Sequence, residues 1–450
     1  MTETVHVGIA PSVRIENQII DKKANKWESV LLHLSVFAIL LPAAAESCSA
    51  SLVVLSFLIP RGWRFVPKLH PIVQVFRTFW KTLFFVWLLL VLASVLQYFA
   101  HGDALDFKPY FRLMGKQGVW GTCLIAAFLY LQMKRSKSFL NPRALLVFSL
   151  SLLIYAVLQR TYGFDWVHGF AARLGSHREA YGVFRVSGWM DHPLTFAFNL
   201  MLFSLFSLAQ GLWLWQGSER KEARFWFVHT AILFAILLLT DSRYPILLTF
   251  LLILVGLAWE FPKLRKLLAG GVVLLGVVVV GLGLFLPQES FGRWGELFDS
   301  KVALEQRFDR LIFWKINWQL FWNEPWIGTG LARYESTLLD TYLHAGYTSL
   351  ERKYNAHSIY LQTLADGGLL GGIGLLILLT ALGRLAIEVR KRFHHLGLVL
   401  IFLATLGGGL VQNHLRDTEY LFALWTCIAL CLSGLLVKRK GQAVDADAKI

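Results

Sequence analysis

The chain has 450 residues, of which 56% are hydrophobic and only 16% are charged. Apolar runs of about 20 residues recur along it, which is the length that an α-helix needs to cross a hydrocarbon core of about 30 Å. This pattern predicts an all-α membrane protein and excludes an outer-membrane barrel, whose segments are shorter and alternate in hydrophobicity. The net charge of +15 is spread over short loops between the apolar runs, so it indicates contact with anionic lipid and not with nucleic acid.

The apolar runs predict about twelve membrane-spanning helices. These spans cover residues 28–45, 47–60, 82–101, 118–133, 144–162, 193–215, 225–241, 244–261, 269–286, 365–383, 396–412 and 420–437. With this count the basic loops all fall on one side of the membrane, together with the two basic tails. The basic loop positions include Arg61, Arg64, Lys68, Arg77, Lys81, Lys134, Arg135, Lys137, Arg143, Arg384, Arg390, Lys391 and Arg392. The positive-inside rule therefore predicts that both termini are cytoplasmic.

This topology divides the chain into five parts. They are an N-terminal tail (1–26), nine helices with an outer loop at 163–192 (27–286), a large outer loop (287–364), three helices (365–437) and a C-terminal tail (438–450). The long polar lead does not resemble the short basic region of a signal peptide. The four cysteines lie in or beside spans without a histidine or carboxylate partner, so neither a disulfide framework nor a metal site is expected.

The large outer loop contains a predicted amphipathic helix at 301–323. Its apolar residues recur mostly at three- and four-residue spacing, and several of them are tryptophans. Such a helix can lie in the outer membrane interface with its tryptophans at the level of the headgroups. Asn323-Glu324-Pro325 ends the helix, and Gly328-Thr329-Gly330 is typical of a turn.

Three arginines on the outer side are candidates for binding an anionic substrate. Arg243 follows Asp241-Ser242 at the outer end of the seventh span, and Arg307 and Arg310 lie on the amphipathic helix. Arginine suits a diphosphate because its planar fork forms two parallel hydrogen bonds. The alternatives are a snorkelling side chain for Arg243 and a solvated helix face for the other two.

His357 lies just before the tenth span, at the end of the longest polar loop. A neutral histidine at a membrane–water boundary can remove a proton from a sugar hydroxyl, although a histidine in such a loop is often structural. The outer arginines favour the catalytic interpretation. Glycine motifs for nucleotide phosphates are absent, and the glycines that follow Asp366 are typical of close helix packing.

The smaller outer loop offers secondary candidates before the sixth span. Arg185 is a candidate substrate contact, whereas Asp191 and His192 are equally consistent with a turn that begins a helix. His414 and Arg416, between the last two spans, lie on the same side but are not assigned to the site. His394 and His395 fall on the cytoplasmic side and receive no role.

These pieces resemble the O-antigen ligase and polymerase superfamily of bacterial inner membranes. The C-terminal signature is approximated by Ala356-His357-Ser358-Ile359-Tyr360-Leu361 with Ala365-Asp366-Gly367-Gly368-Leu369-Leu370-Gly371. Upstream, Arg310-Leu311-Ile312-Phe313-Trp314 and Pro325-Trp326-Ile327-Gly328-Thr329-Gly330 resemble an "R-x-x-x-W … P-x-x-G-x-G" stretch. Ser242-Arg243 resembles the family's "S-R" pair. The chain departs from the family pattern at Ser358, where asparagine is frequent, and at Asp366, where glutamate is usual.

The resemblance implies a glycosyltransferase with a GT-C-like architecture, in which a periplasmic helical subdomain covers a cavity that opens to lipid. Its donor would be a glycan on undecaprenyl diphosphate, and for a ligase its acceptor would be a sugar hydroxyl of lipid A–core oligosaccharide. His357 would act as the general base, while Arg243 and Arg310, with Arg307 and Arg185, would bind the diphosphate. The expected reaction inverts the anomeric centre and uses no cofactor or metal.

Two alternatives remain at the level of sequence. A polymerase of O-antigen or exopolysaccharide would use nearly the same donor chemistry, with a second undecaprenyl-linked repeat unit as the acceptor. A transporter is the default for a protein with about twelve spans, but it predicts charged side chains within the spans and internal repeats. The predicted spans are almost wholly apolar, which disfavours a transporter. The single dominant outer loop, which ends in the histidine motif, resembles the ligase pattern more than the polymerase pattern, so ligation is the leading hypothesis.

Overall fold

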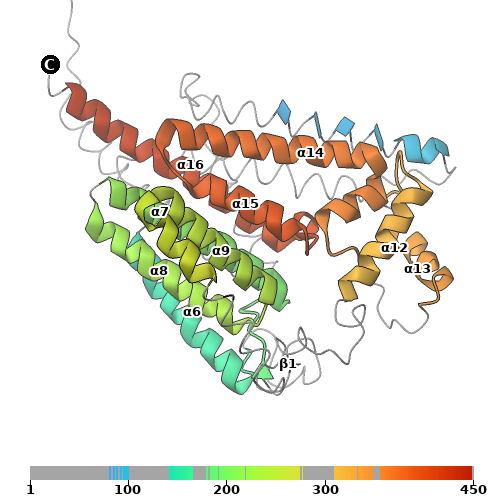
Figure 1. The fold of residues 1–450 in the computed structure, drawn as a ribbon, viewed down its shortest axis with the longest axis horizontal. Helices are drawn as coiled ribbons and strands as arrows, with labels where there is room; N and C mark the ends of the chain where they lie inside the picture. The colour runs from blue at the N-terminus through green and yellow to red at the C-terminus, as the bar shows by residue number, and fades with distance from the viewer. Residues whose placement is uncertain are drawn as a thin grey trace, which may run out of the picture.

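The computed structural model describes six parts of the chain. They are residues 81–100 with gaps, 141–165, 179–217 without 181, 182 and 191, 219–276 without 274 and 275, 309–347 without 332, and 355–447. In these parts the chain is almost entirely helical (Figure 1). The prediction of a mainly α-helical fold is thus confirmed for the described residues.

One group of long helices is built around α7. The group comprises α6 (Pro142–Tyr162), α7 (Pro193–Gln216), α8 (Arg220–Leu239) and α9 (Arg243–Glu260), the last followed by the short η3 (Pro262–Leu264). α7 packs against α8 and α9 and also against α15 and α16. α7 is apolar on all sides, so it can occupy the interior of this helix group. Of its most apolar stretch of 18 residues, 94% is buried.

The second group holds the C-terminal helices. α14 (Ile359–Phe393) packs against α15 (Gly397–Gly409), which in turn packs against α7 and α9. The short η5 (His414–Arg416) connects α15 to α16 (Thr418–Asp447). α14 is interrupted at Gly368, whose φ of 59° and ψ of −156° are not helical, so its first turns form a separate segment ahead of the long apolar part.

Five of the described helices are long and apolar enough to cross a membrane, namely α6, α7, α8, α9 and α14. They coincide with predicted spans, and the shorter apolar helices α15 and α16 coincide with the last two. The predicted spans 28–45, 47–60 and 118–133 lie outside the described residues, and 82–101 and 269–286 are described only in part. The chain is therefore a membrane protein with several spans.

Helix boundaries follow from local chemistry. At the start of α6, the Asn141 side chain accepts a hydrogen bond from the backbone N–H of Arg143, and Pro142 occupies the first helical position. The helix ends at Gly163, which adopts a φ of 64° and donates its N–H to the carbonyl of Gln159. A small antiparallel hairpin, β1 (Glu179–Ala180) and β2 (Val183–Phe184), follows in the loop before α7.

The large loop forms a second, smaller core. It contains α12 (Asp309–Asn323) and α13 (Tyr334–His344), which lie beside the start of α14 (Figure 1). Its buried residues are Phe313, Ile316, Leu320, Tyr334, Leu338, Tyr342 and Ala365. The predicted amphipathic helix ends at Asn323 as expected, and its start lies outside the described residues. Trp318 and Trp322 are 45% and 61% exposed, so these two tryptophans lie on the open face of the helix.

Candidate functional site

The candidate site lies where the connections between the long helices meet. Hydrogen bonds join these connections: the N–H of Val186 donates to the carbonyl of Leu239 (3.5 Å), and the Thr195 hydroxyl donates to Asp417 (2.6 Å). At this end α7, α9, α14 and α16 begin, and α6, α8 and α15 end. The segments before α7 and before α9 are therefore neighbours, and the connection between α15 and α16 lies beside the start of α7.

His357 occupies a strained turn directly before α14. Its φ is +44°, which side-chain-bearing residues rarely adopt, and its N–H donates to Oδ1 of Asn355 at 3.0 Å. The imidazole is partly buried and lies 5.7 Å from the ring of Phe313 on α12. Its Nδ1 lies 2.9 Å from Oε1 of Gln412, in the connection between α15 and α16. Backbone and side chain are thus both held.

Burial lowers the pKa of His357 below its usual value of 6.5. The hydrogen bond that the imidazole donates to Gln412 raises the pKa against this effect, and the positive charge of Arg310 lowers it further. The imidazole is therefore neutral at pH 7. A neutral imidazole can accept a proton, which is the state that a general base requires.

Arg310 and Arg243 approach the same place from different helices. Arg310, at the start of α12, acts electrostatically on His357 and also on Tyr244, the second residue of α9. Arg243 is the first residue of α9 and is only partly buried. Two of the predicted arginines are thus brought to the surroundings of His357, where their positive charges can attract an anion.

Arg185 is buried against the segment that carries Arg243. Its Nε donates to the carbonyl of Thr240 (3.4 Å), and its Nη2 donates to the hydroxyl of Ser242 (3.2 Å). The residue between them, Asp241, has a φ of 53°. Arg185 therefore stabilises the turn that precedes Arg243.

The other predicted residues have different positions. Arg307 and Asp191 lie outside the described residues. The His192 side chain accepts a hydrogen bond from the N–H of Leu194 (3.1 Å) and so begins α7, which was the structural alternative. His414 is buried between the rings of Phe198 and Tyr420, and burial lowers its pKa to about 4.

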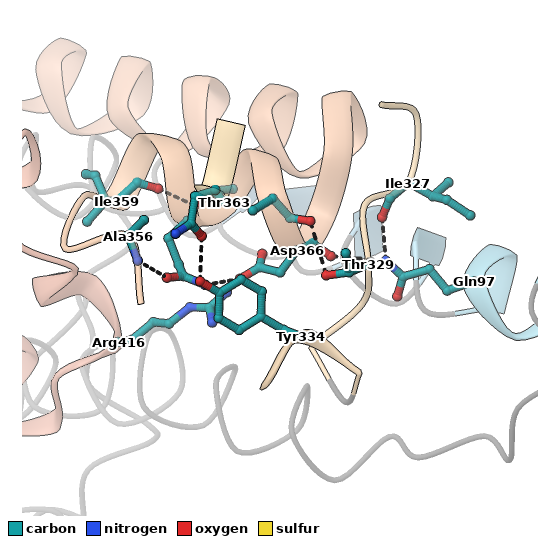
Figure 2. Close-up of polar contacts among 12 residues, drawn as sticks. Gln97, Ile327, Thr329, Tyr334, Ala356, Ile359, Thr363, Asp366 and Arg416 are labelled. Atoms are coloured by element: carbon teal, nitrogen blue, oxygen red, sulfur yellow. Dashed lines mark hydrogen bonds and ion pairs between the residues drawn. The ribbon is translucent and has the colours of Figure 1, made fainter. Parts of the chain in front are cut away.

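A chain of polar contacts connects the turn of His357 to the break in α14 (Figure 2). The N–H of Ala356 donates to Oε1 of Gln362 (3.1 Å), and Nε2 of Gln362 donates to Oδ2 of Asp366 (3.1 Å). Asp366 is in turn ion-paired with Arg416. Arg416, which was left unassigned from the sequence, thus completes a network that holds the backbone on the N-terminal side of His357.

Two glycine-rich segments contact each other at the break in α14. The N–H of Gly330 donates to the carbonyl of Asp366 (2.9 Å), and the N–H of Leu369 donates to that of Pro325 (2.8 Å). These bonds occupy backbone groups that the break at Gly368 frees. A Cβ atom on Gly328 would lie only 2.6 Å from the nitrogen of Gly367, so only glycine permits this approach.

This arrangement brings together the three motifs that resemble the O-antigen ligase and polymerase superfamily, which contain Arg243, Arg310 and His357. Residues 228–376 match the family model described as O-antigen ligase. This match supports the O-antigen ligase superfamily for the segment that carries the motifs. The matched segment runs from α8 to the first part of α14 and includes Arg243, Arg310 and His357. A search among curated proteins gave no match.

A groove runs along α14 away from the His357 turn. It has about 660 Å³ of empty space, part of it open to the surroundings. Its walls are mainly apolar, and one end is polar. The apolar part is lined by Val86, Ala93, Leu375 and Leu378, and the polar end by Gln97, Asp366, Asn413 and Arg416. Ile359, two residues after His357, also lines it, so an apolar chain in this groove would reach the neighbourhood of the imidazole.

Sequence reasoning missed the residues that hold His357. Gln362 is four residues before Asp366 on one helix, and this spacing places the two side chains on one face. Their contact could therefore have been predicted from the sequence. Gln412 is 55 residues from His357, and nothing in the sequence around it indicates the contact. Within the described residues, no three His, Cys, Asp or Glu side chains are gathered in a way that would hold a metal ion.

Proposed function

We propose that this protein is an O-antigen ligase. It transfers a polysaccharide from undecaprenyl diphosphate to a sugar hydroxyl of lipid A–core on the periplasmic face of the bacterial inner membrane. The observation that carries the proposal is the position of a neutral, oriented His357 beside Arg310 and near Arg243, at the end of an apolar helix layer. The family match gives the class of reaction.

In the proposed reaction, the acceptor hydroxyl oxygen attacks the anomeric carbon of the donor. The bond between that carbon and the diphosphate oxygen breaks, and the hydroxyl proton passes to His357. Arg243 and Arg310, with Arg307, stabilise the charge that grows on the leaving diphosphate. Arg185 supports this set through Ser242. A direct displacement of this kind inverts the anomeric centre and needs neither a nucleotide nor a metal.

The groove along α14 supports a lipid-linked donor. It is apolar over most of its length and polar at the end nearest His357. A polyprenyl chain favours the apolar part, because burying each CH₂ group stabilises the complex by about 0.8 kcal/mol. The diphosphate would then lie near the polar end and the arginines.

The proposal includes the predicted topology. About twelve helices cross the membrane, both termini are cytoplasmic, and residues 287–364 form the periplasmic subdomain of a GT-C-like architecture. Reporter fusions after 216, 266 and 347 test the sidedness: an alkaline phosphatase fusion is active only where the fused loop is periplasmic. Activity at 347 and inactivity at 216 and 266 are expected.

The first experiment is a lipopolysaccharide gel from the source bacterium with this gene deleted, complemented by the wild-type chain or by His357→Ala. We expect the deletion and His357→Ala to lose all O-antigen from lipid A–core, with polymer accumulating on undecaprenyl diphosphate. His394→Ala, a histidine at the other end of α14, is the control and should restore the ladder. Core that carries a single repeat unit would identify a polymerase, and an unchanged ladder would exclude both activities.

A further inference from the structure

The connection between α15 and α16 supplies two side chains to the His357 turn. Arg416 pairs with Asp366, which acts on the backbone through Gln362 and Ala356. Gln412 contacts the imidazole itself: its Oε1 lies 2.9 Å from Nδ1. These two contacts therefore have separate effects, one on the position of the backbone and one on the ring.

The contact to the ring decides where the imidazole carries its proton. An amide oxygen can only accept a hydrogen bond, so Nδ1 of His357 must be the donor. In the neutral ring the other nitrogen, Nε2, then carries no proton. The hydrogen bond made by one ring nitrogen sets the protonation of the other.

We propose that Gln412 is a positioning residue that holds His357 in the tautomer protonated on Nδ1, so that Nε2 is the atom that takes the proton from the acceptor sugar. This inference rests on the proposed function, since it specifies how the proposed base is prepared. It adds a residue that lies outside the segment matched by the family model and 55 positions from the histidine.

Among the described residues around the ring, Gln412 contributes an uncharged hydrogen-bond acceptor. Arg310 of α12 acts on the imidazole as a positive charge, and Phe313 of the same helix covers part of the ring. Asp366 of α14 and Arg416 of the connection between α15 and α16 pair with each other. On α9, Tyr244, which follows Arg243 in the chain, interacts electrostatically with Arg310. A carboxylate at position 412 would instead stabilise the protonated imidazolium.

The experiment compares variants of position 412 in purified full-length protein reconstituted in proteoliposomes, with undecaprenyl-diphosphate-linked polymer and lipid A–core as substrates. Gln412→Met keeps the length of the side chain and removes the acceptor oxygen. We expect kcat to fall about 10- to 100-fold, with the KM for both substrates within about twofold of wild type. Gln412→Glu keeps an acceptor and adds a negative charge, so the acidic limb of the pH–rate profile should move to higher pH by about one unit or more.

Gln216→Met is the matched control. Gln216 is the last residue of α7, at the end of the helix away from the site, and its side-chain amide donates a hydrogen bond to Glu260. The substitution therefore removes a side-chain hydrogen bond far from the site. It should leave both kcat and the pH profile unchanged. The melting temperature of each variant reports folding, and the pH shift of Gln412→Glu remains measurable if Gln412→Met does not fold.

The outcomes separate this inference from the proposed function. If His357→Ala retains transfer, the proposed function fails, whatever the variants of Gln412 do. If His357→Ala is inactive while Gln412→Met keeps its kcat and Gln412→Glu keeps the wild-type pH profile, the role of Gln412 is overturned alone.

Discussion

Removing the charge of Arg416 should destabilise the protein and displace the His357 turn. The Asp366 side chain is 4% exposed and its ion-pair partner Arg416 is 28% exposed. Arg416→Met keeps most of the apolar stem but leaves a buried carboxylate without its cation. Breaking a fully buried pair on one side costs about 3–5 kcal/mol, and the partial exposure of Arg416 reduces this to about 2–3 kcal/mol.

The structure also predicts how this cost can be recovered. Asp366→Asn removes the negative charge while its side-chain oxygen can still accept the bond from Gln362. The double variant Arg416→Met/Asp366→Asn should therefore be more stable than Arg416→Met alone, with a coupling free energy of about 1–2 kcal/mol. Reversible unfolding in mixed micelles, followed for both single variants and the double variant, measures this cycle. Additive effects within about 0.5 kcal/mol would refute the reasoning.

Three further predictions concern the glycine contact, the tryptophan face and the pH dependence. Gly328→Ala should lower the free energy of unfolding by about 3 kcal/mol or more and reduce transfer, because its Cβ would overlap backbone atoms of α14. Gly346 also has a positive φ, but no atom lies within 4 Å of the position of its Cβ. Gly346→Ala should therefore lower the free energy of unfolding by only about 1 kcal/mol in the same assay. A nitroxide attached at Trp322→Cys should contact lipid in a bilayer and be relaxed more by oxygen than by a water-soluble nickel chelate; the reverse order would place this face in water. The acidic decline in transfer should have its midpoint below about pH 6.5, because the pKa of His357 is depressed below that value and the base becomes protonated only at lower pH. Arg310→Gln removes one cause of that depression, so the decline should begin at a higher pH; an unchanged limb would show that Arg310 does not face the imidazole.

The sequence predicted those parts of the fold that depend on local composition. α7 and α9 were located within about two residues, because an apolar run of membrane length is a strong signal. The end of α12 was also correct, since Pro325 cannot continue a helix and follows Asn323 closely. The hairpin β1–β2 was not anticipated, because strands of two residues have no periodicity to read.

The candidate site was predictable only where a residue has a recognisable neighbourhood. His357, Arg310 and Arg243 stand in motifs, and the structure brings their surroundings together. Gln412 and Arg416 contribute through contacts that span 55 and 50 positions. Such pairings depend on how α15 packs against α14 and α7, and the hydrophobic pattern of a single helix does not specify which helices become its neighbours.

The contact between Gly328 and Gly368 has a consequence for exchanging parts between relatives. Because the loop backbone replaces hydrogen bonds within α14, the loop helices and the start of α14 form one mechanical unit. If the loop alone were exchanged, it would pack against the α14 break of the other parent. If the loop and the start of α14 were exchanged, they would still lack Gln412 and Arg416, the partners that hold the histidine. A functional chimera should therefore exchange 309–372 together with 410–417, so that the histidine and the side chains that orient it come from the same parent.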